Sequence, residues 1–236
     1  MKIFCFVLLF AACFVQEFTQ TVFVDCLTDF FYGGNNKMID FYINGTKVDV
    51  QIEDEQTVSD VLISFEKTCE ENHVAVIGIT VDGKQITADI FDEESQKPLS
   101  DKMKFEFTVV SENDIKASFI KLTQLFNELA QKMEQIPIEL QNGKNIEASN
   151  SIKQLADAID QFCHIATLAS LFPETFNNSS IENMNFADFF ADFSPILKDF
   201  EEALQNNDTV MIGDLAEYEI CPRLLQISSF LSKIQS

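Results

Sequence analysis

Residues capable of chemistry are few in this chain, and their spacing does not assemble them into a site. His73 and His164 are the only histidines among 236 residues. Glu70 precedes His73 by three positions, but one Glu-x-x-His lacks the second copy that a di-iron helical site requires. Cys163 and His164 adjoin, and neighbours on a helix point about 100° apart, so we do not expect a nucleophile–base pair. We predict no catalytic residue, no metal site and no cofactor, and therefore a protein that is not an enzyme.

Acidic residues gather around one tyrosine near the C-terminal end. Asp214, Glu217 and Glu219 surround Tyr218, shortly before Pro222. Paired carboxylates can perform acid–base chemistry when burial raises one pKa. Charges at helical spacing more often form a solvated face, so we expect an acidic surface patch here.

Phenylalanines form a second group that could act as a binding surface. One face of a helix is expected to carry Phe186, Phe190, Phe193, Leu197 and Phe200, with Phe189 at its edge. Core packing is the main interpretation, but a kinked, Phe-rich helix beside a polar loop could also offer a groove to a partner helix. The candidate partner-binding residues are Phe189, Phe193 and Tyr218.

The charge balance excludes several classes of partner. The formal net charge is −22, with 16 acidic and 6 basic residues in 38–111 and 19 acidic and 8 basic residues in 112–236. Binding to phosphates needs a cluster of Lys and Arg, and Arg223 is the only arginine. We therefore expect a protein partner, and neither nucleic acid nor an anionic membrane surface.

The three cysteines beyond residue 37 are Cys69, Cys163 and Cys221. They are far apart, odd in number and without Cys-x-x-Cys spacing. This pattern favours reduced, partly buried thiols and a cytoplasmic location over a disulfide framework.

Two interpretations remain open for residues 1–37. Ile3 to Val15 is an apolar run after Lys2, typical of a secretory signal, and Ala12-Cys13 loosely matches a lipid-attachment motif. Alternatively, the codons for Gly33 to Lys37 are purine-rich and lie directly before Met38, so the segment could be a translated ribosome-binding site and spacer. The first interpretation predicts an exported or lipid-anchored envelope protein, and the second a cytoplasmic protein that begins at Met38.

Residues 38–111 have the pattern of a small sheet with one helix. Asn44-Gly45 and Asp82-Gly83 are hairpin turns, and the first sets Phe41 opposite Val48. Thr57 to Asp60 is a capping box for an amphipathic helix, whose inward residues are Val58, Val61, Leu62, Phe65 and Cys69. The crossover rule makes 46–81 a βαβ unit in which the second and third strands run in the same direction. This order resembles the β-grasp, or ubiquitin-like, fold.

Residues 112–236 have the pattern of long amphipathic helices. The first has a heptad seam, formed by Ile115, Phe119, Leu122, Phe126, Leu129, Met133 and Ile136. The second is expected to bury Ile152, Leu155, Ile159, Phe162 and Ala166, and the fourth Met211, Leu215, Leu224, Ile227, Leu231 and Ile234. Pro137 should bend or end its helix, and Pro195 and Pro222 should kink theirs. The whole chain is thus predicted to be α+β, with a β-grasp domain at 38–111 and an antiparallel four-helix bundle-like domain at 112–236.

Several short motifs resemble those of an uncharacterised group of acidic bacterial proteins common in clostridia. The motifs are Val81-Asp82-Gly83, Pro98 to Asp101, Ala203-Leu204 and Asp214 to Glu219. That group joins a ubiquitin-like segment to a C-terminal helical domain, and the resemblance implies no known activity. The lack of groups arranged for chemistry, together with two interaction-prone modules, leads us to expect a non-enzymatic adaptor or chaperone-like protein.

Overall fold

The computed structural model describes residues 39–50, 52, 54–176 and 186–234. It divides into two compact units between Asp114 and Ile115. The two interpretations of residues 1–37, and most of the loop expected at 174–184, fall outside the described residues.

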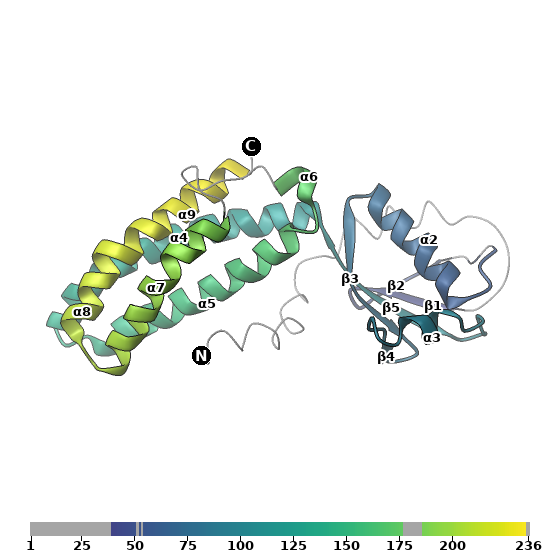
Figure 1. Ribbon diagram of the computed structural model, residues 1–236, viewed down its shortest axis with the longest axis horizontal. Helices are drawn as coiled ribbons and strands as arrows, with labels where there is room; N and C mark the ends of the chain where they lie inside the picture. The colour runs from purple at the N-terminus through teal and green to yellow at the C-terminus, as the bar shows by residue number, and fades with distance from the viewer. Residues whose placement is uncertain (1–38, 51, 53, 177–185, 235–236) are drawn as a thin grey trace. The chain divides into compact units, whose positions relative to one another are not determined.

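In the described part of the first unit, five strands form one mixed sheet (Figure 1). The strands are β1 (Asp40–Ile43), β2 (Thr46–Val48), β3 (Val74–Val81), β4 (Lys84–Gln85) and β5 (Lys104–Ser111). Their order across the sheet is β2-β1-β5-β3-β4, so the last strand in sequence is the central one. β1 and β5 are parallel, and the other neighbouring pairs are antiparallel.

The registers of both predicted hairpins are confirmed. Phe41 pairs with Val48 across the first turn, and Val81 pairs with Lys84 across the second. β2 and β3 run in the same direction, as the crossover rule predicts, but β1 and β5 lie between them. The adjacent parallel pair is β1 and β5, which the sequence reasoning did not identify.

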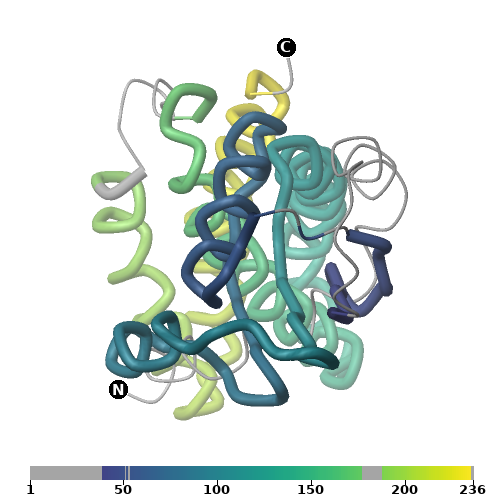
Figure 2. The backbone as a smooth tube through the Cα atoms, turned by 90° about the vertical axis from the view of Figure 1, so that its right-hand side faces the viewer, coloured from purple at the N-terminus to yellow at the C-terminus, as the bar shows by residue number. Residues whose placement is uncertain are grey.

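Helix α2 (Val58–Glu71) packs on one face of this sheet. Its predicted capping box is confirmed, because Thr57 Oγ1 accepts from the Asp60 N–H at 3.2 Å and the Asp60 carboxylate accepts from the Thr57 N–H at 2.9 Å. All five predicted inward residues are buried. Figure 2 shows α2 in front of the sheet. Phe65 of α2 stacks on Phe107 of β5, with ring centroids 3.8 Å apart.

A β-bulge in β3 lets side chains on both sides of the bulge face the same core. One extra residue, Ile77, interrupts the register of β3 against β5. Val76 pairs with Val109 before the bulge, and Ile79 pairs with Phe107 after it. Side chains alternate between the two faces of a strand, so the bulge returns the β-branched residues to the face that α2 covers. Val76 and Ile79 both pack against that core.

Both Asx-Gly turns are fastened to the central strand. Asn44 has a φ of 48°, and its side chain donates to the Val109 carbonyl at 3.1 Å and accepts from the Val109 N–H at 2.9 Å. Asp82 has a φ of 49°, and its carboxylate accepts from the Lys104 N–H at 2.8 Å. The residue that permits each turn thus also anchors its hairpin to β5.

The connection after β4 contains the short helix α3 (Phe91–Ser95) and a buried acid. Glu94 lies 2.6 Å from the ammonium groups of both Lys84 and Lys97, and these two hydrogen bonds lower its pKa. The apolar character of Ile90, Phe91 and Leu99 predicts that all three pack on the core. Leu99 is buried and Ile90 is half-buried, but Phe91 is exposed.

The second unit is helical, and its long helices lie alongside one another (Figure 1). The long and short helical elements are α4 (Glu112–Gln141), α5 (Asn145–Ala169), α6 (Pro173–Phe176), α7 (Phe186–Gln205), α8 (Thr209–Asp214), a π-helical turn η2 (Leu215–Ile220) and α9 (Cys221–Ile234). α4 follows β5 without an intervening loop.

Contacts along α4 show that its neighbours run in the opposite direction. Phe126 packs edge-on against Phe162 of α5, with centroids 5.6 Å apart, and further along α4 Lys132 bonds to Gln154, which lies earlier in α5. The Ser228 hydroxyl of α9 donates to the Thr123 carbonyl of α4 at 3.2 Å. α4 therefore packs antiparallel to α5, and the Ser228 contact joins it to α9.

The predicted seam of α4 is confirmed, since all seven of its residues are buried. Pro137 does not end this helix, which continues to Gln141. A Cβ added to Gly213 of α8 would lie 3.3 Å from Pro137 Cβ. Glycine at 213 therefore allows α8 to approach α4 closely at the proline.

The inward faces of α5 and α7 differ from those expected, and in α5 small residues take the place of large ones. α5 buries Ala148, Ser151 and Ala158 beside the predicted Leu155 and Phe162, and Ile152 and Ile159 are only half-buried. α7 buries Phe189, Phe193 and Phe200, and Phe190 is half-buried. The prediction that Phe189 sits at an edge is wrong. Small side chains let helices approach closely, and this closeness favours faces that a count of large apolar residues does not identify.

We predict that Asn44→Gly destabilises the chain by about 1–3 kcal/mol, because glycine keeps the turn but loses both hydrogen bonds to Val109. Urea unfolding followed by circular dichroism measures the loss. Lys102→Gly is the matched control, since Lys102 is an exposed turn residue of the same unit with a φ of 72°. Equal stabilities for the two variants would contradict a role for the Asn44 side chain.

Candidate functional site

The groups first considered for chemistry lie apart. His73 is largely exposed, 3.8 Å from Glu112, whereas Cys163 and His164 are half-buried on α5. Among the described residues, no group of three or more His, Cys, Asp or Glu side chains is arranged to hold a metal ion.

The described cysteines are free thiols in environments that suppress ionisation. Burial raises the pKa of Cys69 to about 12, and burial followed by Asp160 raises the pKa of Cys163. Burial also raises the pKa of Cys221, with Glu134 and Glu217 adding to it. Because the thiolate is the nucleophile, these three sulfurs are poorly suited to nucleophilic chemistry at neutral pH.

Two of the three predicted partner-binding residues belong to the core. Phe189 is 1% exposed and Phe193 is 0% exposed, and their rings lie 5.9 Å apart. Phe189 also packs edge-on against Phe190 at 5.9 Å. As folded, neither Phe189 nor Phe193 lies on a surface, in agreement with the core-packing interpretation.

The third, Tyr218, lies on a π-helical turn that joins α8 to α9. Asp208 caps the start of α8, because its carboxylate accepts from the Met211 N–H at 3.0 Å. η2 then widens the helix, and the Cys221 N–H bonds to the Ala216 carbonyl five residues earlier. α9 follows, with Pro222 near its start. The helix therefore widens by a π turn just before the proline, where the sequence predicted a kink.

The π turn explains which residues of this composite helix are buried. From α8 through the π turn into α9, the buried residues include Ile212, Ala216, Ile220 and Leu224, each four positions after the last. In an α-helix every such step drifts by about 40° around the axis, and a wider turn removes part of that drift. The predicted inward residue Met211 is instead exposed and Leu215 half-buried.

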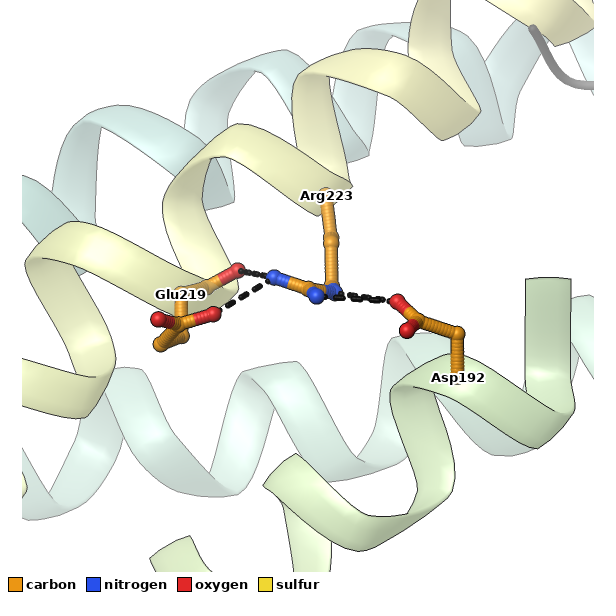
Figure 3. Close-up of polar contacts among 3 residues, drawn as sticks. All are labelled: Asp192, Glu219 and Arg223. Carbon is orange, nitrogen blue, oxygen red and sulfur yellow. Dashed lines mark hydrogen bonds and ion pairs between the residues drawn. The ribbon is translucent and has the colours of Figure 1, made fainter.

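The single arginine holds the π turn to α7 (Figure 3). Arg223 donates to the Asp192 carboxylate of α7 at 2.8 Å and to the Glu219 carboxylate at 2.8 Å. It also donates to the Glu219 backbone carbonyl at 3.0 Å. Pro222 has no N–H, so the preceding turn lacks one backbone donor, and the guanidinium supplies a side-chain donor to a carbonyl of that turn.

A line of apolar side chains follows the outward side of the same composite helix. Its members, the outer stripe, are Met211, Leu215, Tyr218, Pro222 and Leu225. Tyr218 is 65% exposed, Leu225 48% and Met211 42%, Pro222 is exposed and Leu215 is half-buried. The spacing of four, three, four and three is that of a helix–helix seam. The composite helix is thus apolar on two sides.

Acidic groups border the outer stripe and act on its tyrosine. Asp214 is exposed and Glu217 half-buried beside Tyr218. A hydrogen bond to Glu217, followed by the charges of Glu217 and Asp214, raises the pKa of Tyr218. The phenol is protonated at neutral pH and is engaged by the Glu217 carboxylate.

Sequence reasoning found Tyr218 and the acidic residues but missed the rest of the stripe. It assigned Met211 and Leu215 to the core and did not consider Leu225. One signal in the sequence could have identified the stripe as outward. Ile212, Ala216, Ile220 and Leu224 recur at a constant spacing of four and form an alternative inward face.

Comparison with known proteins finds matches over both units. Residues 39–111 match the family model of the TP0873 N-terminal domain, and residues 117–230 match a domain of unknown function (DUF8042). A protein of Treponema pallidum (strain Nichols), described as an uncharacterized protein, is 25% identical over 190 residues, which cover 80% of this chain and 94% of that protein. No solved structure matches the chain. These matches support the resemblance of this chain to an uncharacterised bacterial family.

The described residues contain no helix that is both long and apolar enough to cross a membrane.

We predict that Arg223→Lys lowers stability by about 1–2 kcal/mol, because a lysine cannot reproduce the forked contacts to Asp192 and to the Glu219 carbonyl. Urea unfolding at low and high salt measures this. Asp192→Asn removes only an exposed ion pair, so its smaller loss should vanish at high salt. If the loss in Arg223→Lys also vanished, the carbonyl contact would contribute nothing.

A second prediction concerns His164, whose pKa is lowered by burial from an ordinary value of 6.5. Below pH 6.5 the unfolded chain takes up a proton that the folded chain does not, so this histidine lowers stability as pH falls through that range. His164→Gln should therefore lose less stability than the parent between pH 7.5 and 5.5 in urea titrations. His73→Gln is the control for replacing an exposed histidine. Parallel stability–pH curves for His164→Gln and the parent would contradict the prediction.

Proposed function

We propose that this chain is a non-enzymatic protein-interaction protein, of the adaptor or chaperone-like kind. Its acidic helical unit binds a partner protein, and the sheet unit offers a second contact surface. The observation that carries the proposal is the outer stripe, a line of largely exposed apolar residues on a helix whose inward side is already buried. Exposed apolar residues that form a continuous line with a polar border are typical of interaction surfaces.

The charge distribution supports a protein as the partner. Both units are strongly acidic, and Arg223, the one arginine, is engaged by Asp192 and Glu219. Nucleic acids and anionic membranes require the opposite charge. The thiols have raised pKa values and the histidines lie apart. These properties fit a role in binding better than a role in catalysis.

We further propose that the sheet unit is a β-grasp domain. The features that support this are the mixed sheet with its first and last strands parallel and adjacent, and the single helix on one face. The helical unit is proposed to be a four-helix bundle of up-down topology. Its support is the antiparallel pair of contacts between α4 and α5, together with the Arg223–Asp192 contact that joins the composite helix to α7.

A cytoplasmic location belongs to the same proposal. The rival is export or lipid anchoring through residues 1–37, as the apolar run and Ala12-Cys13 suggest.

The proposal predicts that the full chain, cross-linked in its own cells and purified from the cytoplasmic fraction, brings down one enriched protein partner. Mass spectrometry identifies the partner, and fractionation of the same cells locates the chain. Recovery in the membrane fraction would favour the rival. A monomeric chain that captures nothing and binds no hydrophobic dye would overturn the interaction proposal.

A further inference from the structure

We infer that the outer stripe docks a cationic amphipathic helix of a partner protein. This inference rests on the proposed interaction function and deepens it by naming the surface and the chemistry of the partner. It concerns only the composite helix of α8, η2 and α9, within the second unit.

The first argument is the double apolar character of this helix. A surface helix of a globular protein normally has one apolar side, which packs on the core. Here Ile212, Ala216, Ile220 and Leu224 already fill that role. The outer stripe is a second apolar side, which a second neighbour would bury. Within the described residues, Tyr218, Met211 and Leu225 all remain exposed.

The second argument is the spacing of the stripe, which selects a helix as the occupant. Intervals of four, three, four and three residues are those at which one helix packs along another. From 211 to 225 the stripe spans about 21 Å, at about 1.5 Å per residue, which is about four turns of a partner helix. Tyr218 lies at its centre, where a large, amphipathic side chain contributes most to binding.

The third argument is charge complementarity. Between residues 186 and 234 there are nine acidic and three basic side chains. Asp214 and Glu217 border the stripe directly, and Arg223 is held by two carboxylates. A partner helix must therefore present Lys or Arg beside its apolar side, since like charges facing one another across an interface are unfavourable.

The same argument disfavours a second copy of this chain. Each copy has a net charge of −22, and a two-fold contact through the stripe would place Asp214 and Glu217 of one copy opposite the acidic border of the other. A cationic helix meets no such repulsion.

The test uses a synthetic amphipathic helix of about 18 residues with leucine on one side and lysine on the other. Fluorescence anisotropy should detect its binding to the full chain. Tyr218→Ser combined with Leu225→Ser should weaken binding by at least about tenfold. Ile63→Ser, which removes an exposed apolar residue from α2, is the matched control and should leave binding unchanged. A peptide with glutamate in place of lysine should not bind. Circular dichroism checks that each variant is folded.

Equal binding of the peptide to the parent and to the stripe variant would show that charge attraction alone causes binding, and this result would overturn the inference. So would a dimer in sedimentation that the stripe substitutions dissociate, because the stripe would then bind another copy. Cross-linking in cells with the stripe variant distinguishes a failure of this inference from a failure of the proposed interaction function. If the cellular partner is still captured, the interaction function stands and the docking surface is wrong.

Discussion

The hydrogen bonding of β5 is the constraint on which the sheet unit depends. This strand is the last of five in sequence, yet it lies between β1 and β3. Asn44 and Asp82, the residues that permit the two hairpin turns, both reach across to its backbone. β5 pairs with β1 of the first hairpin and with β3 of the second, and residues of both hairpins belong to one core. The strand is followed directly by α4 in the chain.

In the helical unit the corresponding constraint is the close packing of the composite helix. Gly213 lies against Pro137, and inward residues recur at every fourth position through the π turn. The π turn places these residues inward but loses regular α-helical hydrogen bonds. The contacts of Arg223 with Glu219 and Asp192 offset this loss. The same change of geometry that buries Ile220 leaves Tyr218 on the outside. Stability and the candidate binding surface therefore have one structural cause.

Candidate residues were predicted with uneven success, for an identifiable reason. Tyr218 was found because acidic neighbours and a following proline mark it as exposed, and these are local features. Phe189 and Phe193 were considered for a surface because the sequence does not say how closely α7 approaches α5. Met211 and Leu215 were assigned to the core because apolar character alone does not distinguish an inward stripe from an adjacent outward one. The choice between the two stripes depended on the π turn.

The sequence by itself determined the local structure of this protein. Asx-Gly turns, the capping box at Thr57 and the seam of α4 all depend on residues within a few positions of one another, where φ preferences and side-chain periodicity decide the outcome. Tertiary structure alone decided the neighbours of β5, the bulge at Ile77 and the inward faces of α5, α7 and the composite helix. These depend on distances between elements far apart in the chain, and such distances are set by the volumes of the side chains that meet there.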